Sequence, residues 1–93
     1  MRYIYSKHIL DRMKERDISK EEIDLLLISD IFKINLGSTQ DIDVKLILGY
    51  IGEKGIVVVI NTKTNKLITV RKMRVSEKKL FKEAKNERET NQR

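Results

Sequence analysis

Apolar residues near the start of the chain recur at helical spacing and predict a first helix over about residues 6–16. Ser6 is a good N-cap, because its hydroxyl can accept a hydrogen bond from an otherwise unpaired backbone N–H of the first turn. Asp17, directly after this segment, is expected to take a turn or left-handed conformation. The side chains expected to face the core are Ile9, Leu10 and Met13.

A second helix is predicted to begin after Ser19. Ser19 and Glu22 have the spacing of a capping box, in which each side chain accepts a hydrogen bond from the backbone of the other residue. Ile18, directly before the cap, can pack against Ile23 inside the helix. The expected buried stripe of this helix consists of Ile23, Leu26 and Leu27.

From residue 30 onward the apolar positions alternate with a period of two, which is typical of strands. Four strands are expected, at residues 31–36, 42–51, 56–61 and 66–72. Gly52–Gly55 predicts a tight hairpin turn, and such short connections favour an antiparallel sheet. In the last strand, strict alternation would place Leu67, Thr69 and Arg71 on one face and Ile68, Val70 and Lys72 on the other.

The chain is expected to end in a short basic helix capped by Ser76. Its apolar residues are few, which predicts a weakly docked helix that frays over about residues 87–93. The whole pattern therefore predicts one α+β domain over residues 1–93. In it, two N-terminal helices pack on a four-stranded antiparallel sheet, and a short C-terminal basic helix follows.

Composition narrows the class of protein. Among 93 residues there is no cysteine, so neither a disulfide nor a thiolate metal site is expected. The longest uninterrupted apolar run, residues 56–60, is far below the ~20 residues that span a bilayer. The first ten residues show no secretory signal. We therefore expect a soluble, cytoplasmic protein that does not contact membranes.

The net charge of +6 is concentrated at the two ends of the chain. Residues 1–20 carry +3, residues 21–70 carry −2, and residues 71–93 carry +5. If the ends meet in the fold, they would form one positive surface for a phosphate-bearing partner. The alternative is an ordinary solvated surface rich in lysine and glutamate. The candidate nucleic-acid-binding residues are Arg71, Lys72, Arg74, Lys78, Lys79 and Lys82.

One polar row on the first helix carries candidate chemistry. His8 is the only histidine, and Arg12 and Arg16 follow at four-residue intervals, so the three share one helix face. An imidazole can give or take a proton near neutral pH, and guanidiniums can stabilise charge on phosphate oxygens. A lone histidine at a helix start is more often a surface residue, however. The arginines could also simply pair with Asp11 or Glu15.

The run from Tyr5 to Ser19 resembles the signature of a family of uncharacterised toxin-like prokaryotic domains. In that signature a serine, any residue and a histidine are followed, four residues on, by arginine-methionine and then a second arginine. The family is similar to the toxin superfamily of RelE, BrnT, barnase, EndoU and the tRNA-cutting colicins. The resemblance implies a RelE-like domain with N-terminal helices on a four-stranded antiparallel sheet.

The resemblance also implies an active face made of the first-helix residues and a threonine of the last strand. In this chain the matching positions are His8, Arg12, Arg16 and Thr69. Two positions depart from the pattern. Where the family has a glycine before the isoleucine, this chain has Asp17. Where the family often has an aromatic residue two positions after the threonine, this chain has Arg71.

From the polar row and the resemblance we hypothesise that the protein is a metal-independent endoribonuclease. A 2′-hydroxyl of RNA would attack the adjacent phosphorus, with His8 as general base or acid. Arg12, together with Arg16 or Arg71, would stabilise the phosphorane, and Thr69 would hydrogen-bond a phosphate oxygen or orient His8. The product would be a 2′,3′-cyclic phosphate, and no metal or other cofactor would be needed. Toxins of this type pair with an antitoxin protein, which is a second expected partner besides RNA.

Two other functions are compatible with the sequence. The chain could be a non-catalytic module that binds RNA or DNA through its basic last strand and helix. It could also be a protein-interaction domain on a toxin fold. Tyr3, Tyr5 and Tyr50 could stack on bases, although such tyrosines more often fill the rim of a small core.

Overall fold

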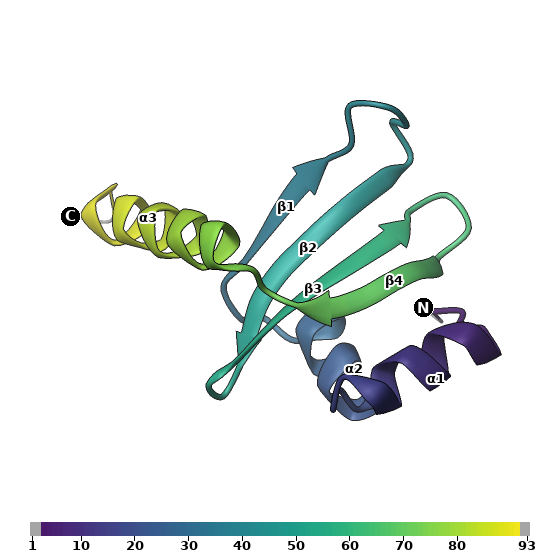
Figure 1. Ribbon diagram of the computed structural model, residues 1–93. Helices are drawn as coiled ribbons and strands as arrows, with labels where there is room; N and C mark the ends of the chain where they lie inside the picture. Colours follow the sequence, from purple (N-terminus) through teal and green to yellow (C-terminus); the bar gives the residue numbers. More distant parts are fainter. Residues whose placement is uncertain (1–2, 92–93) are drawn as a thin grey trace.

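A four-stranded antiparallel sheet carries two helices on one face, and a third helix lies beside its first two strands (Figure 1). The computed structural model describes residues 3–91. The elements, in chain order, are α1 (Lys7–Glu15), α2 (Lys20–Ile28), β1 (Lys33–Gly37), β2 (Val44–Ile51), β3 (Lys54–Asn61), β4 (Lys66–Lys72) and α3 (Val75–Asn91). The strands lie in sequence order, each antiparallel to the next. The predicted α+β architecture is confirmed.

Both N-terminal helices begin where their caps were predicted. The Ser6 hydroxyl accepts a hydrogen bond from the Ile9 backbone N–H at 3.1 Å. Ser19 and Glu22 form the complete capping box: Glu22 Oε1 accepts from the Ser19 N–H at 2.8 Å, and the Ser19 hydroxyl accepts from the Glu22 N–H at 3.1 Å. Asp17 joins the two helices with a φ of 56°, in the left-handed region. The predicted entry to α2 is therefore confirmed in detail.

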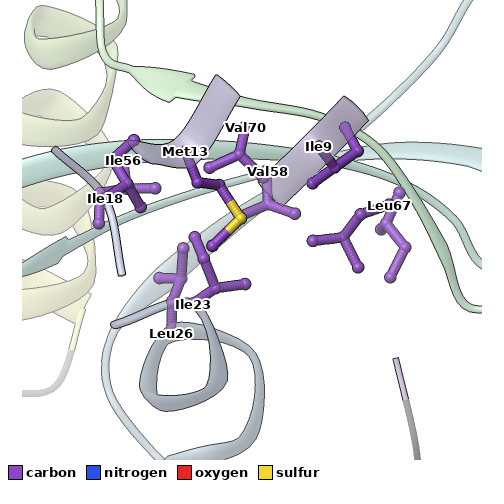
Figure 2. Packing of buried hydrophobic residues seen from close by; sticks show 10 residues of the cluster. Ile9, Met13, Ile18, Ile23, Leu26, Ile56, Val58, Leu67 and Val70 are labelled. Carbon is purple, nitrogen blue, oxygen red and sulfur yellow. The ribbon is translucent and has the colours of Figure 1, made fainter. Parts of the chain in front are cut away.

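The main core fills the space between these two helices and the sheet. Figure 2 shows Met13 of α1 among side chains of β3, β4 and α2. Ile23 and Leu26 of α2 are fully buried in the same cluster. α2 can approach β2 closely because Gly49 has no side chain, since a Cβ there would overlap Leu26 Cδ1. Close packing of this kind supplies most of the stability of a chain this short.

A β-bulge in β4 overturns the predicted alternation of that strand. Val59 pairs with Thr69 but Ile60 pairs with Leu67, so Ile68 is an extra residue without a partner on β3. Leu67 and Val70 consequently share the face buried under the helices, and Ile68 is 47% exposed. Thr69 points to the opposite face, because its partner Val59 packs there. The prediction that Leu67 shares a face with Thr69 and Arg71 is wrong.

The second face of the sheet holds a smaller cluster, to which α3 contributes Phe81. α3 begins at Val75, two residues earlier than a cap at Ser76 would place it. Glu77 stabilises this start: it accepts a hydrogen bond from the Arg74 backbone N–H and two from the Arg71 guanidinium, at 2.6 and 2.8 Å. The helix continues to Asn91, past the predicted start of fraying at residue 87. Residues 92–93 of the predicted frayed tail lie outside the described residues.

The Arg71–Glu77 ion pair makes the stability of the fold depend on pH. The hydrogen bonds from Arg71, with a smaller contribution from the Arg74 N–H, lower the pKa of Glu77 from 4.5 to about 2 in spite of partial burial. A carboxyl group with a lowered folded-state pKa stabilises the fold above its unfolded-state pKa, and this contribution is lost as the pH falls toward the folded-state value. We expect Glu77→Gln to lower the free energy of unfolding at pH 7 by about 2–3 kcal/mol.

The measurement is urea denaturation of wild type and Glu77→Gln between pH 7 and pH 2. The difference between the two proteins should shrink as the pH falls from about 4.5 to about 2. Glu83→Gln, at an exposed position on the same helix, is the control and should change stability little. A difference that stays constant down to pH 2 would contradict the assignment.

Candidate nucleic-acid interface

The polar row on α1 divides into exposed and structural residues. His8 and Arg12 are exposed, and Arg12 forms a 3.6 Å ion pair with Glu15, whose side chain is also exposed. Arg16 is partly buried, and its Nη1 donates a 2.6 Å hydrogen bond to the backbone carbonyl oxygen of Val70 in β4. That hydrogen bond holds α1 against the sheet. Arg16 therefore has a structural role whatever its other role is.

His8 lines a groove of about 450 Å³ at the end of the sheet where β3 turns into β4. The polar side chains that share this groove include Asn61, Thr64 and Lys66. Sequence reasoning did not single out these three residues, because the turn that carries them lies more than fifty positions from His8. The groove brings an imidazole and an ammonium group to one surface.

Thr69 does not join His8. α1 covers one face of the sheet, and the Thr69 side chain lies on the other, as the pairing with Val59 requires. The bulge at Ile68 sets this orientation, and a bulge leaves no clear signal in the sequence. The geometry does not bring the four predicted catalytic residues together.

Two of the predicted nucleic-acid-binding residues, Arg71 and Lys72, lie close to the C-terminal end of α1. Arg16, Arg71 and Lys72 line a groove of about 380 Å³ together with Glu15 and Asp17. The guanidinium of Arg71 is already bound by Glu77, and this hydrogen bond is the main cause that raises the pKa of Arg71. Arg71 is thus held as an anchor of α3, and two carboxylates line the groove beside it.

A third groove, of about 910 Å³, lies between α3 and the start of β1 and the β2–β3 hairpin. Aromatic side chains form its apolar floor: Phe32, Tyr50 and Phe81. Lysines on one side of α3 form its rim: Lys78, Lys79, Lys82 and Lys85. Three of these lysines were predicted as nucleic-acid-binding residues, whereas Lys85 was missed although it continues the same helical spacing.

The rim lysines of α3 have no ion-pair partner among the side chains of residues 3–88, although Glu53 also lines the groove. All four are exposed. Arg74, also a predicted binding residue, is exposed directly before α3. The groove therefore combines an apolar floor with a concentrated positive rim, which is the composition that polyanion-binding surfaces share.

Neither a clustered metal site nor a bilayer-spanning helix is found in the part of the chain that the structure describes. Among the side chains of residues 3–88, no cluster of three or more histidine, aspartate or glutamate residues could hold a metal ion. No helix in the same part of the chain has both the length and the apolar character needed to cross a bilayer.

The two arginines of the α1 row should differ in their effect on stability. We expect Arg16→Ala to lower the free energy of unfolding by about 1–2 kcal/mol, because the Val70 carbonyl group loses its charged donor. Arg12→Ala should change it by less than about 0.5 kcal/mol, because the Arg12–Glu15 pair is exposed. Urea denaturation at neutral pH measures both changes. Equal losses in the two variants would show that the hydrogen bond of Arg16 does not hold α1.

Comparison of the chain with protein-family models, with curated proteins and with solved structures finds no match. The resemblance to the RelE-type toxin superfamily therefore stays a prediction from the α1 motif. The candidate interface, the groove beside α3, is identified from its lining residues alone.

Proposed function

We propose that this chain binds RNA through the groove between α3 and the sheet. The observation that carries the proposal is the row of four lysines that line one groove without carboxylate partners among the described side chains. Like charges on one helix face repel one another, and a bound polyanion relieves that repulsion. The excess charge of +5 over residues 71–93 adds to the attraction.

The arrangement of the lysines favours a polymer over a small anion. Lys78 and Lys85 are separated by about 10 Å along the helix axis, at 1.5 Å per residue, with Lys82 between them. Such a row can contact successive phosphates of one strand, whereas a single small anion would contact one end of it. The resemblance of α1 to ribonuclease toxins favours RNA over DNA.

Removing the lysine row should weaken binding and its dependence on salt. We expect the triple variant Lys78→Gln/Lys82→Gln/Lys85→Gln to bind RNA at least tenfold more weakly at low salt. The slope of log K against log[salt] should fall in magnitude by about 2, at roughly 0.7 per phosphate contact on a single strand. Fluorescence anisotropy of a labelled RNA over a series of salt concentrations measures both quantities.

The matched control removes three lysines elsewhere on the surface, so that the net charge falls equally. The control positions are Lys7, Lys14 and Lys63, all exposed and outside the groove. If the control variant loses as much affinity and slope as the α3 variant, the chain attracts RNA by net charge alone. The proposed interface would then be wrong.

RNA cleavage at the other end of the sheet is a second candidate function. The observation that favours it is the groove that His8 shares with Lys66. In the reaction, the 2′-oxygen forms a bond to phosphorus while the bond from phosphorus to the 5′-oxygen breaks. His8 accepts the proton of the 2′-hydroxyl, and a general acid or water supplies a proton to the departing 5′-oxygen. Lys66 can stabilise the charge on the phosphorane, a role that the sequence had suggested for Arg12.

Cleavage is tested with a labelled RNA in EDTA. If this second function holds, wild type leaves a 2′,3′-cyclic phosphate, and His8→Ala lowers the rate by about 100-fold or more. Lys66→Ala should lower the rate as well, whereas Arg12→Ala should not, because Arg12 does not line the groove. Binding measured by anisotropy should stay the same in all three variants. Intact RNA, or full activity of His8→Ala, would remove His8 from any catalytic role.

A further inference from the structure

The floor of the α3 groove is an ordered group of three aromatic rings. The Phe81 ring centroid lies 5.2 Å from that of Phe32 and 5.1 Å from that of Tyr50, with interplanar angles of 72° and 71°. Phe81 is buried, whereas the other two rings are only partly buried and line the groove. Phe81 therefore supports its two neighbours, and Tyr50 presents the accessible aromatic surface.

The rings are held in place from more than one side. Tyr50 lies opposite Gly55 in the sheet, and a Cβ at Gly55 would come within 3.1 Å of the tyrosine ring. The guanidinium of Arg88 lies over the Phe32 ring, 5.1 Å from its centroid. An aromatic surface that is fixed before binding loses little conformational entropy when a ligand stacks on it.

We propose that the groove recognises single-stranded RNA, with an unpaired base stacked on Tyr50 and the phosphates along the α3 lysines. This inference rests on the proposed RNA binding and adds the class of RNA. An unpaired base has a free face that can stack on an aromatic side chain, whatever its sequence. A duplex keeps its bases stacked inside and offers only its phosphates, which would engage the rim and leave the floor unused.

The row of charges also favours a nucleic-acid strand over an acidic peptide. Three of the rim lysines, Lys78, Lys82 and Lys85, recur at intervals of four and three residues, which is about one turn of the helix. Regular spacing of this kind matches the regular phosphates of a strand. A peptide with scattered carboxylates gains little from such a row.

The test compares wild-type binding to three labelled ligands by anisotropy, and each individual strand in them has the same number of phosphates. They are a single-stranded RNA of twelve nucleotides, the same strand annealed to its complement, and a twelve-unit abasic strand. We expect the single strand to bind about 5- to 100-fold more tightly than the abasic strand, since each stacked base is worth about that factor. Tyr50→Leu should lose most of the difference, whereas Tyr3→Leu, outside the groove, should keep it.

The two proposals fail in different ways. If all three ligands bind equally well in a salt-dependent manner, the lysine rim binds phosphate but the stacking inference is overturned. If none of them binds, the proposed function fails as well. Displacement of the single strand by polyglutamate or by anionic vesicles at equal charge would also overturn the stacking inference. The comparison of ligands uses wild type alone, so a Tyr50→Leu protein that does not fold leaves the test intact.

Discussion

The docking of α1 against strand β4 determines which surfaces of the chain are left for function. Ile9 and Met13 bury the apolar side of α1, and the Arg16 guanidinium binds the Val70 carbonyl group beyond them. Farther along the same strand, Ile4 pairs with the backbone around Lys66 through hydrogen bonds of 2.9 and 3.1 Å. The outer edge of β4 is thereby covered, which limits strand addition by another chain. The same docking places His8 at the end of the sheet that carries the β3–β4 turn, away from α3.

The two candidate grooves lie at opposite ends of one strand. The His8 groove includes Asn61, at the end of β3, and the α3 groove includes Glu53, just before its start. An eight-residue strand is roughly 25 Å long, so a short RNA held at α3 cannot reach His8. The proposed binding and the proposed cleavage would therefore be separable in this molecule. If both occur, the RNA must extend over several nucleotides along the sheet or around its edge.

Most predictions that depend on neighbouring residues are confirmed, although Leu10, which was expected to face the core, is 43% exposed. The predictions that failed otherwise depend on distant residues. The caps at Ser6 and Ser19 and the left-handed Asp17 follow from local chemistry, and the structure confirms them. The orientation of Thr69 depends on a bulge that only the pairing of β3 with β4 reveals. The basic residues of α3 were visible as charge, but nothing in the sequence showed that the rings of Phe32 and Phe81 would meet beneath them.

The manner in which α3 is anchored explains why its lysines remain available. Glu77, the acidic residue of the first turn, is occupied by Arg71 of the sheet and by the Arg74 backbone, so it does not neutralise the neighbouring lysines. Phe81 then fixes the helix through a single buried ring. Charges one helical turn apart lie within the Debye length of about 8 Å at physiological ionic strength, so the lysines still repel one another in the free protein. A bound row of negative charge would remove this repulsion and strengthen the docking of α3, so the stability of the helix would be coupled to the occupancy of the groove.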